Sequence, residues 1–318
     1  MFNEKHSPWN LSSTPFFIRM DYFRIKDIEN LTGIKAHTLR IWEKRYKLIV
    51  SKRKDSNHRY FDNEDLKTIL QIRYLYETDF KISQIAKLSP EAIATFTHID
   101  HSNSKSTDAF ILQLINAMID FNGNDFNSIL NAAIDQFGMQ KAITEIAYGF
   151  MRRIGLLWLT NHMIPAQEHF ATNLIKSRLI KAIEESPKKQ ENKDQITLLF
   201  TPPGEFHEIP LLFIHFLFKQ NNRGVCYLGT NTTMEDLSYC IEKRQITHLY
   251  FHLITNLTGK TINELVEELL TQFPTIPLIV SGPLANQISI SSPNLVCLQS
   301  IEEMLQFPIH FMNPELQN

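Results

Sequence analysis

The sequence has little cysteine, and none of it is paired. Only three cysteines occur among the 318 residues. Cys226, Cys240 and Cys297 each lie in an apolar segment and form no C-x-x-C pair, so we interpret them as core residues in a reducing compartment. This usage excludes a disulfide framework and a paired-cysteine zinc site.

Long apolar runs are also missing. The longest one, IPLLFIHFLF, is interrupted by His215 and reaches about half of the roughly 20 residues that a membrane span requires. No secretory signal is visible at the N-terminus. We therefore expect a cytoplasmic protein with no membrane-bound part.

The chain lacks a strong overall charge, but its charge is unevenly distributed. The net charge is −2, whereas residues 21–90 hold 15 Lys and Arg against 10 Asp and Glu, which gives +5 there and −7 elsewhere. A basic end is typical of nucleic-acid-binding modules. A chain of this length has room for two or three domains.

Hydrophobic periodicity divides the chain into segments of different kinds. Apolar spacing at i, i+3, i+4 and i+7 predicts a bundle of four amphipathic helices. Five apolar strands that alternate with helical stretches then predict a doubly wound parallel α/β sheet of the Rossmann or flavodoxin-like type. The expected order is a flexible arm (1–20), a basic helical domain (21–90), a linker (91–107), the four-helix bundle (108–186) and the sheet domain (195–318).

The basic domain has the pattern of a helix, a glycine turn and a second helix, written YFRIKDIENLTGIKAHTLRIWEKRY. From Lys35 to Arg59 there are nine basic residues and two acidic ones. A helix with this charge fits the major groove of DNA, and the basic loop that follows it suits phosphate contacts. The alternative is a solvated basic face on an interaction helix.

The stretch IKAHTLRIWEKRY, with the basic loop ending in NHRYF, resembles the winged helix-turn-helix of the MerR family of transcriptional regulators. That resemblance implies double-stranded operator DNA as a partner and binding as a homo-oligomer. Leu39, Ile41 and Tyr46 lie at core spacing, and Trp42 either packs or touches phosphate. The DNA contacts that the resemblance assigns are Thr38, Arg40, Trp42, Lys44, Arg45, Arg53, His58, Arg59 and Tyr60.

A second chemical signal follows the first predicted strand of the sheet. The segment TPPGEFHEIP places Glu205 and His207 at the carboxyl end of that strand, where open α/β sheets bind ligands. In the bundle, nine residues separate Trp158 from the pair Glu168 and His169. Such a pair in apolar surroundings needs partners, unless it is exposed at a helix end.

Together, IGLLWLTNHMIPAQEHFATNLIKSRL and TPPGEFHEIP resemble the cobalamin-binding domains of MerR-type regulators of the CarH, CarA and LitR type. The resemblance implies that His207 is the lower axial ligand of cobalt and that Glu205 fixes its tautomer. We expect a non-enzymatic repressor whose dimeric or tetrameric assembly and DNA binding follow adenosylcobalamin, with light as a candidate signal. The implied cofactor contacts are Trp158, Glu168, His169, Glu205, His207, His252, Ser281 and Gly282.

Three residues depart from the pattern that this resemblance sets. Pro210 stands in place of a glycine, His252 in place of a small serine, and Leu159 in place of a histidine that follows the tryptophan. These departures leave a second hypothesis open, in which a degenerate corrinoid fold binds no cobalamin and answers to a protein partner or another ligand. A corrinoid enzyme or methyl carrier fits less well, because a DNA-binding module is an odd companion for either.

Overall fold

The computed structural model describes residues 22–53, 59–77, 80–98, 106–158, 165–186, 192–255 and 259–310. Of the residues singled out above, His58, Leu159 and the side chain of Trp158 lie outside this description. The chain forms two compact units, Met1–Gly138 with Tyr148–Glu168, and Met139–Ala147 with His169–Asn318. Each unit is described by itself.

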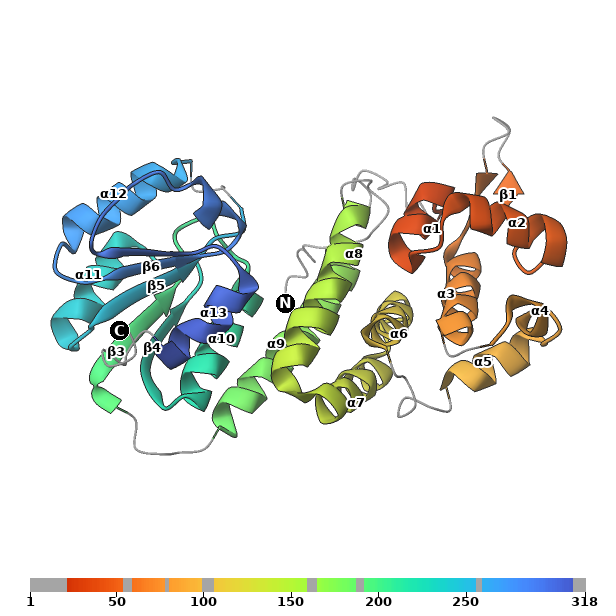
Figure 1. Cartoon of the computed structure of the whole chain (residues 1–318), viewed down its shortest axis with the longest axis horizontal. Helices are drawn as coiled ribbons and strands as arrows, with labels where there is room; N and C mark the ends of the chain where they lie inside the picture. Colours follow the sequence, from red (N-terminus) through yellow and green to blue (C-terminus); the bar gives the residue numbers. More distant parts are fainter. Residues whose placement is uncertain are drawn as a thin grey trace, which may run out of the picture. The chain divides into compact units, whose positions relative to one another are not determined.

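The N-terminal head of the first unit, residues 22–98, is the expected winged helix-turn-helix (Figure 1). Gly33 ends the first helix in the left-handed conformation (φ 73°), and its N–H donates to the Glu29 carbonyl, which is the turn that glycine favours. A helix also covers the start of the segment expected as a linker. The elements are α1 Ile25–Thr32, α2 Ala36–Tyr46, β1 Lys52–Arg53, β2 Arg59–Tyr60, α3 Asn63–Glu77, α4 Ile82–Ile85 and α5 Pro90–His98.

The expected amphipathic helices follow the head. Gly138 has a φ of 78° and interrupts α7, and a π-helical turn then leads into α8. Ser106 caps α6 by accepting a hydrogen bond from the Ala109 N–H, as serine commonly does at this position. The bounds are α6 Thr107–Ile119, α7 Gly123–Lys141, η2 Ala142–Ala147, α8 Tyr148–Trp158 and α9 Pro165–Glu184.

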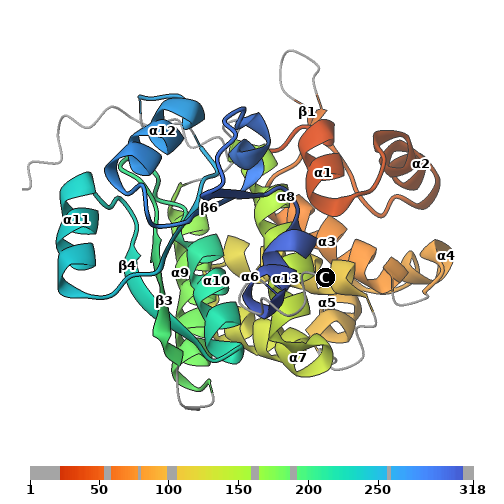
Figure 2. The same ribbon diagram turned by 60° about the vertical axis from the view of Figure 1, so that its left-hand side comes forward.

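Within the first unit the head packs on the bundle, α3 against α6 and α1 against α8 (Figure 2). Three charged side chains, Arg73, Asp108 and Arg153, join these helices, and we call them the Asp108 cluster. Arg73 Nε donates to the Thr32 carbonyl (3.2 Å) and Arg153 Nη1 to the Leu31 carbonyl (3.3 Å), while both guanidinium groups pair with the Asp108 carboxylate. The last carbonyls of α1 are therefore capped by cations, one of them from the bundle.

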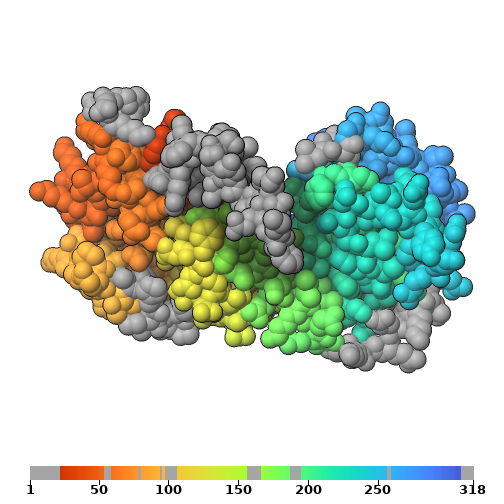
Figure 3. Space-filling model, turned by 180° about the vertical axis from the view of Figure 1, so that it is seen from behind, coloured from red at the N-terminus to blue at the C-terminus, as the bar shows by residue number. Residues whose placement is uncertain are grey.

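Seen in space-filling form, the orange head and the yellow bundle helices lie against each other on the rear face (Figure 3). Lys67 of α3 adds a further ion pair to Asp120 at the end of α6. The interface of head and bundle thus combines helix packing with ion pairs.

The second unit contains the expected five-stranded parallel sheet, with strand order β4-β3-β5-β6-β7. The chain leaves β3 toward β4 on one side and continues through β5 on the other, so the topological switch point lies between β3 and β5. The strands are β3 Asn192–Phe200, β4 Arg223–Gly229, β5 His248–His252, β6 Leu278–Ser281 and β7 Leu295–Leu298.

Helices cover both faces of this sheet (Figure 1). Leu249 and Phe251 pack on the face of α11 and α12. Tyr250 points to the other face, where it meets Phe218 of α10 and Phe307 of α13. This alternation follows from the two-residue period of a strand. The covering elements are α10 Glu208–Gln220, α11 Met234–Lys243, α12 Ile262–Gln272, η3 Pro283–Gln287 and α13 Ile301–His310.

Gly282 is required by the backbone packing at the end of β6. Its φ is 105°, and a Cβ atom at this position would lie 2.4 Å from the Leu253 carbonyl oxygen. Gly229 also has a positive φ (88°), but a Cβ there would come no closer than 3.6 Å to the Tyr227 ring. An alanine at Gly229 would thus introduce backbone strain alone, whereas an alanine at Gly282 would introduce both strain and steric overlap.

We expect Gly282→Ala to lower the free energy of unfolding of the sheet unit by about 3 kcal/mol, because strain and overlap add. Gly229→Ala, the control, should cost about 1 kcal/mol from backbone strain alone. Calorimetric unfolding of the full chain measures both variants. Equal losses for the two would contradict the steric role of Gly282.

Candidate functional site

The recognition helix α2 turns one face inward and one outward. Leu39 and Trp42 are buried, and the Trp42 ring meets the Tyr76 ring edge to face with centroids 5.7 Å apart. Of the two roles left open for Trp42, the structure supports packing. Ile41, which the spacing places in the core, is instead 51% exposed. The exposed residues of α2 are His37, Arg40, Ile41, Lys44 and Arg45, with Thr38 partly exposed.

Glu43 connects this helix to the wing. Its carboxylate accepts hydrogen bonds from the Ser51 N–H (2.9 Å) and hydroxyl (2.5 Å), and it pairs with Arg59 Nε at 3.7 Å. Burial opposes ionisation, but the Ser51 hydrogen bonds and the Arg59 charge outweigh it, so the pKa of Glu43 is lowered. This role of Glu43 was not identified from the sequence. A single acidic residue within so basic a helix could have indicated that it binds a neighbouring basic segment.

The described residues of the wing strands expose their basic side chains to solvent. Arg53 and Arg59 are exposed, and Tyr60 is half-buried against Tyr22, with ring centroids 5.6 Å apart. Lys52 pairs with Asp62 and Asp65, so its charge is already neutralised within the head. Arg53 and Arg59 are the exposed arginines of the wing strands, and Arg59 is also held by Glu43.

At the carboxyl end of β3, Glu205 and His207 lie as the sequence predicts. Glu205 is fully buried. Its Oε1 accepts from the His207 N–H (2.9 Å) and lies 2.5 Å from His207 Nδ1. Oε2 accepts from the Ile254 N–H (2.9 Å), the Thr255 N–H (2.8 Å) and the Thr255 hydroxyl (3.2 Å). One carboxylate therefore joins both loops that flank the switch point.

This arrangement orients the His207 imidazole. Because Nδ1–H donates to Glu205, the second ring nitrogen, Nε2, carries the lone pair of the neutral ring. The His207 side chain is 49% exposed, and His207 is the N-cap residue of α10. A half-exposed imidazole with a fixed tautomer can coordinate a metal ion through Nε2.

Next to this pair, a polar chain crosses the ends of β5 and β6. The Tyr250 hydroxyl donates to Ser281 Oγ (2.8 Å), which lies 2.8 Å from His252 Nδ1. All three residues are buried. Burial, against the charge of Glu205, lowers the pKa of His252 to about 4, so its ring is neutral at pH 7. Tyr250 was missed in the sequence, where it reads as one more strand residue.

Pro210 is buried in the first turn of α10, where proline is tolerated. Beside it, the Glu208 carboxylate accepts from the Tyr227 hydroxyl (3.1 Å) and pairs with Lys176 of α9 (3.1 Å). The departure at Pro210 therefore leaves this end of the sheet intact.

The residues expected from the bundle are less completely described. Trp158 ends α8, Glu168 is half-buried, and His169 is exposed in the first turn of α9. Glu168 and His169 fall at the boundary of the two units. The roles of Trp158, Glu168 and His169 toward the cofactor therefore stay predictions of the resemblance.

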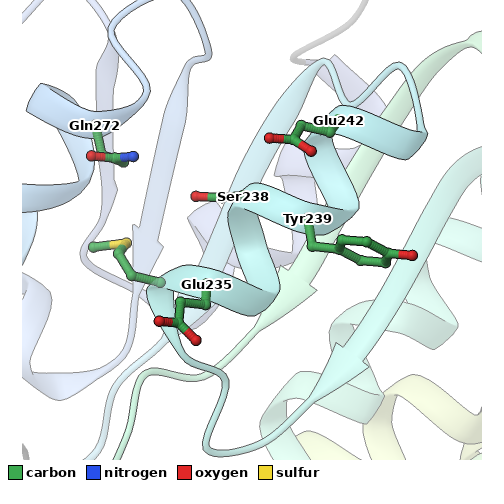
Figure 4. Close-up of a pocket in the computed structure, with 6 residues that line it drawn as sticks. Glu235, Ser238, Tyr239, Glu242 and Gln272 are labelled. Carbon is green, nitrogen blue, oxygen red and sulfur yellow. The ribbon is translucent and has the colours of Figure 1, made fainter.

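A surface depression of about 430 Å³ lies between α11 and α12 (Figure 4). It is on the opposite face of the sheet from α10, and it contains no residue expected to bind the cofactor. Its lining residues are Met234, Glu235, Ser238, Tyr239, Glu242 and Gln272.

We also find no helix, in the part of the chain that the structure describes, with the length and apolar character to cross a membrane.

Comparison with known proteins gives two domain matches. Residues 23–92 match the family described as MerR HTH family regulatory protein, and residues 111–181 match the B12 binding domain. The second match covers the bundle that bears Trp158, Glu168 and His169.

Two curated relatives match over most of the chain. The HTH-type transcriptional repressor CarH of Myxococcus xanthus is 20% identical over 83% of this chain and 89% of its own. CarA of the same organism, also an HTH-type transcriptional repressor, is 24% identical over 81% and 86%. Among solved structures, the monomethylamine corrinoid protein of Methanosarcina barkeri is 13% identical, covers 65% of this chain and all of its own, and has a TM-score of 0.48.

We expect Glu205→Gln to destabilise the sheet unit by about 3 kcal/mol at pH 7. Burial raises the pKa of Glu205, but hydrogen bonds from His207, Thr255 and Ile254 lower it further, to about 2. A depressed pKa stabilises the fold above the ordinary value of about 4.5, and this contribution is lost as the pH falls toward 2. The gap between wild type and variant, measured by urea unfolding, should therefore shrink below pH 4.5. A gap independent of pH would contradict this account.

We expect Lys44→Ala to weaken binding to a duplex that the protein selects from a random pool by about tenfold. The slope of log affinity against log salt concentration should fall by about one, because one phosphate contact is lost. Lys243→Ala removes the same charge from exposed α11 in the other unit and is the matched control. Fluorescence anisotropy at several salt concentrations measures both, and equal slopes would place Lys44 outside the DNA interface.

Proposed function

Because the chain is a MerR-family regulator that carries a B12-binding domain, we propose that it is a transcriptional repressor whose DNA binding is controlled by adenosylcobalamin. The head supplies a basic recognition helix and a wing, which together suit operator DNA. The relatives that match over most of the chain are named as repressors, which supports regulation rather than catalysis.

The observation that carries the cofactor proposal is the pair Glu205 and His207. A carboxylate on Nδ1 fixes the tautomer that leaves Nε2 for a metal, and His207 is half-exposed at the N-terminus of α10. His207 would hold the cobalt ion of a corrin through Nε2, and Glu205 would keep the imidazole ring in place. When bound, adenosylcobalamin supplies a cobalt–carbon bond that light can break, and by resemblance Trp158, Glu168 and His169 contact the corrin.

Control of assembly is part of the same proposal. A ligand shifts an equilibrium between assemblies only by its differential affinity for them. We propose that adenosylcobalamin favours the homo-oligomer, dimer or tetramer, that binds the operator, and that illumination removes this preference. Leu159 stands where light-sensing relatives have a histidine, so no protein ligand is assigned to the upper side of the cobalt.

A second function is favoured by one observation. The buried chain of Tyr250, Ser281 and His252 satisfies its own hydrogen bonds, as expected of a site that has lost its ligand. In this alternative the same head binds DNA, and the sheet unit receives its signal from a protein partner or another small molecule.

Reconstitution with adenosylcobalamin in the dark decides between the two. We expect the purified full chain to retain the corrinoid, with an absorbance spectrum that changes in His207→Ala. The control is His37→Ala, which removes an exposed imidazole from α2. Size-exclusion chromatography and operator binding, dark and illuminated, then test the control of assembly. A colourless protein that still binds its selected DNA would establish the alternative.

A further inference from the structure

We infer that the ends of β5 and β6 disfavour the nucleotide tail of a corrinoid, so that a corrinoid without this tail binds at His207 more tightly than adenosylcobalamin does. This inference rests on the proposed function. It concerns which corrinoid the site accepts, and it names Tyr250 as the residue that determines specificity.

The position of His207 sets the direction that a tail has to take. A protein imidazole on the lower side of cobalt displaces the cofactor's own base, which then has to lie beside that imidazole. His207 is the N-cap residue of α10, and α10 covers the face of the sheet to which Tyr250 points. A tail that continues into the sheet domain from His207 would therefore pass between this face and its helices, at the ends of β3 and β5.

That space is occupied by the protein's own aromatic rings. Tyr250 lies 6.2 Å from Phe218 and 5.9 Å from Phe307, measured between ring centroids, and the two phenylalanines are 6.1 Å apart. Their exposed fractions are 0% for Tyr250, 1% for Phe218 and 7% for Phe307. Three mutually contacting rings form a packed core layer, and a base the size of an indole enters such a layer only if a ring leaves.

A closed set of hydrogen bonds lies directly above these rings. Tyr250 donates to Ser281, and Ser281 can then donate its own proton only to the unprotonated Nδ1 of His252. Burial keeps His252 neutral, since its pKa is lowered to about 4. A tail that passed this point would break both hydrogen bonds and leave buried polar atoms to be satisfied again.

His252 and Ser281 face each other in register at the ends of the two strands. Two hydrogen-bonded side chains, His252 and Ser281, therefore lie at the ends of β5 and β6, where the tail would have to pass. Neither can change its rotamer without breaking this hydrogen bond. Glu205 also holds the loop after β5 by accepting hydrogen bonds from the Ile254 and Thr255 N–H groups. Placing a tail in this space would require the ring layer and the hydrogen bonds of Tyr250, Ser281 and His252 to rearrange.

The test compares two ligands on the wild type and on a variant, so that the difference between the two proteins reports on the tail and not on the base that His207 displaces from cobalt. We expect the full chain, in the dark, to bind adenosylcobinamide, which lacks the nucleotide tail, at least tenfold more tightly than adenosylcobalamin, as followed by absorbance titration. Tyr250→Ala removes the ring and should raise the affinity for adenosylcobalamin at least tenfold with little change for adenosylcobinamide. Tyr250→Phe keeps the ring and removes only the hydrogen bond to Ser281, so it should retain most of the wild-type preference for adenosylcobinamide.

The outcomes separate this inference from the function on which it rests. Equal affinity of the wild type for both ligands, with a spectrum that depends on His207, would overturn tail selection and leave the corrinoid-controlled regulator standing. Failure of the wild type and of Tyr250→Ala to bind either ligand would overturn both. If Tyr250→Ala does not fold by circular dichroism, Phe307→Ala takes its place, because it removes another ring of the same layer and should likewise raise the affinity for adenosylcobalamin alone.

Discussion

The Glu205 carboxylate holds together the part of the sheet unit where chemistry is expected. It accepts from the loop after β3 and from the loop after β5, which are the two loops that diverge at the switch point. Because the carboxylate is fully buried, each of these hydrogen bonds forms in a medium of low dielectric constant, where leaving a donor unpaired is costly. The orientation of His207 and the position of the loop after β5 both depend on this one group.

The sequence predicted the winged head, the amphipathic helices and the five parallel strands, because periods of 3.6 and 2 residues report burial directly. It also placed Glu205 and His207 at one strand end, and the resemblance to cobalamin-binding domains implied that they pair. It failed where the tertiary structure decides. Ile41 has core spacing within α2, yet it lies on the exposed face because the buried side of that helix is set by Leu39 and Trp42.

The remaining features were hidden for a different reason. Tyr250 is one apolar residue among several in β5, and only the packing of α10 and α13 shows that its ring fills the sheet face. Glu43 acts through Ser51 and Arg59, which are brought to it by the fold of the wing. A local sequence pattern identifies residues whose side chains can bind or ionise. It does not identify the partners of Glu43 and Tyr250, which are separated from them in sequence and come into contact only in the folded chain.

The Asp108 cluster bears on how the head behaves as a module. Arg73 belongs to the head and Arg153 to α8, yet both donate to the last carbonyls of α1, and Asp108 of α6 neutralises both. The C-terminus of α1 is thus completed by residues that a domain boundary drawn after α5 would leave behind. A chimera that moves the head to another protein would therefore have to include α6 and α8. The smallest segment that can be exchanged is larger than the DNA-binding fold itself.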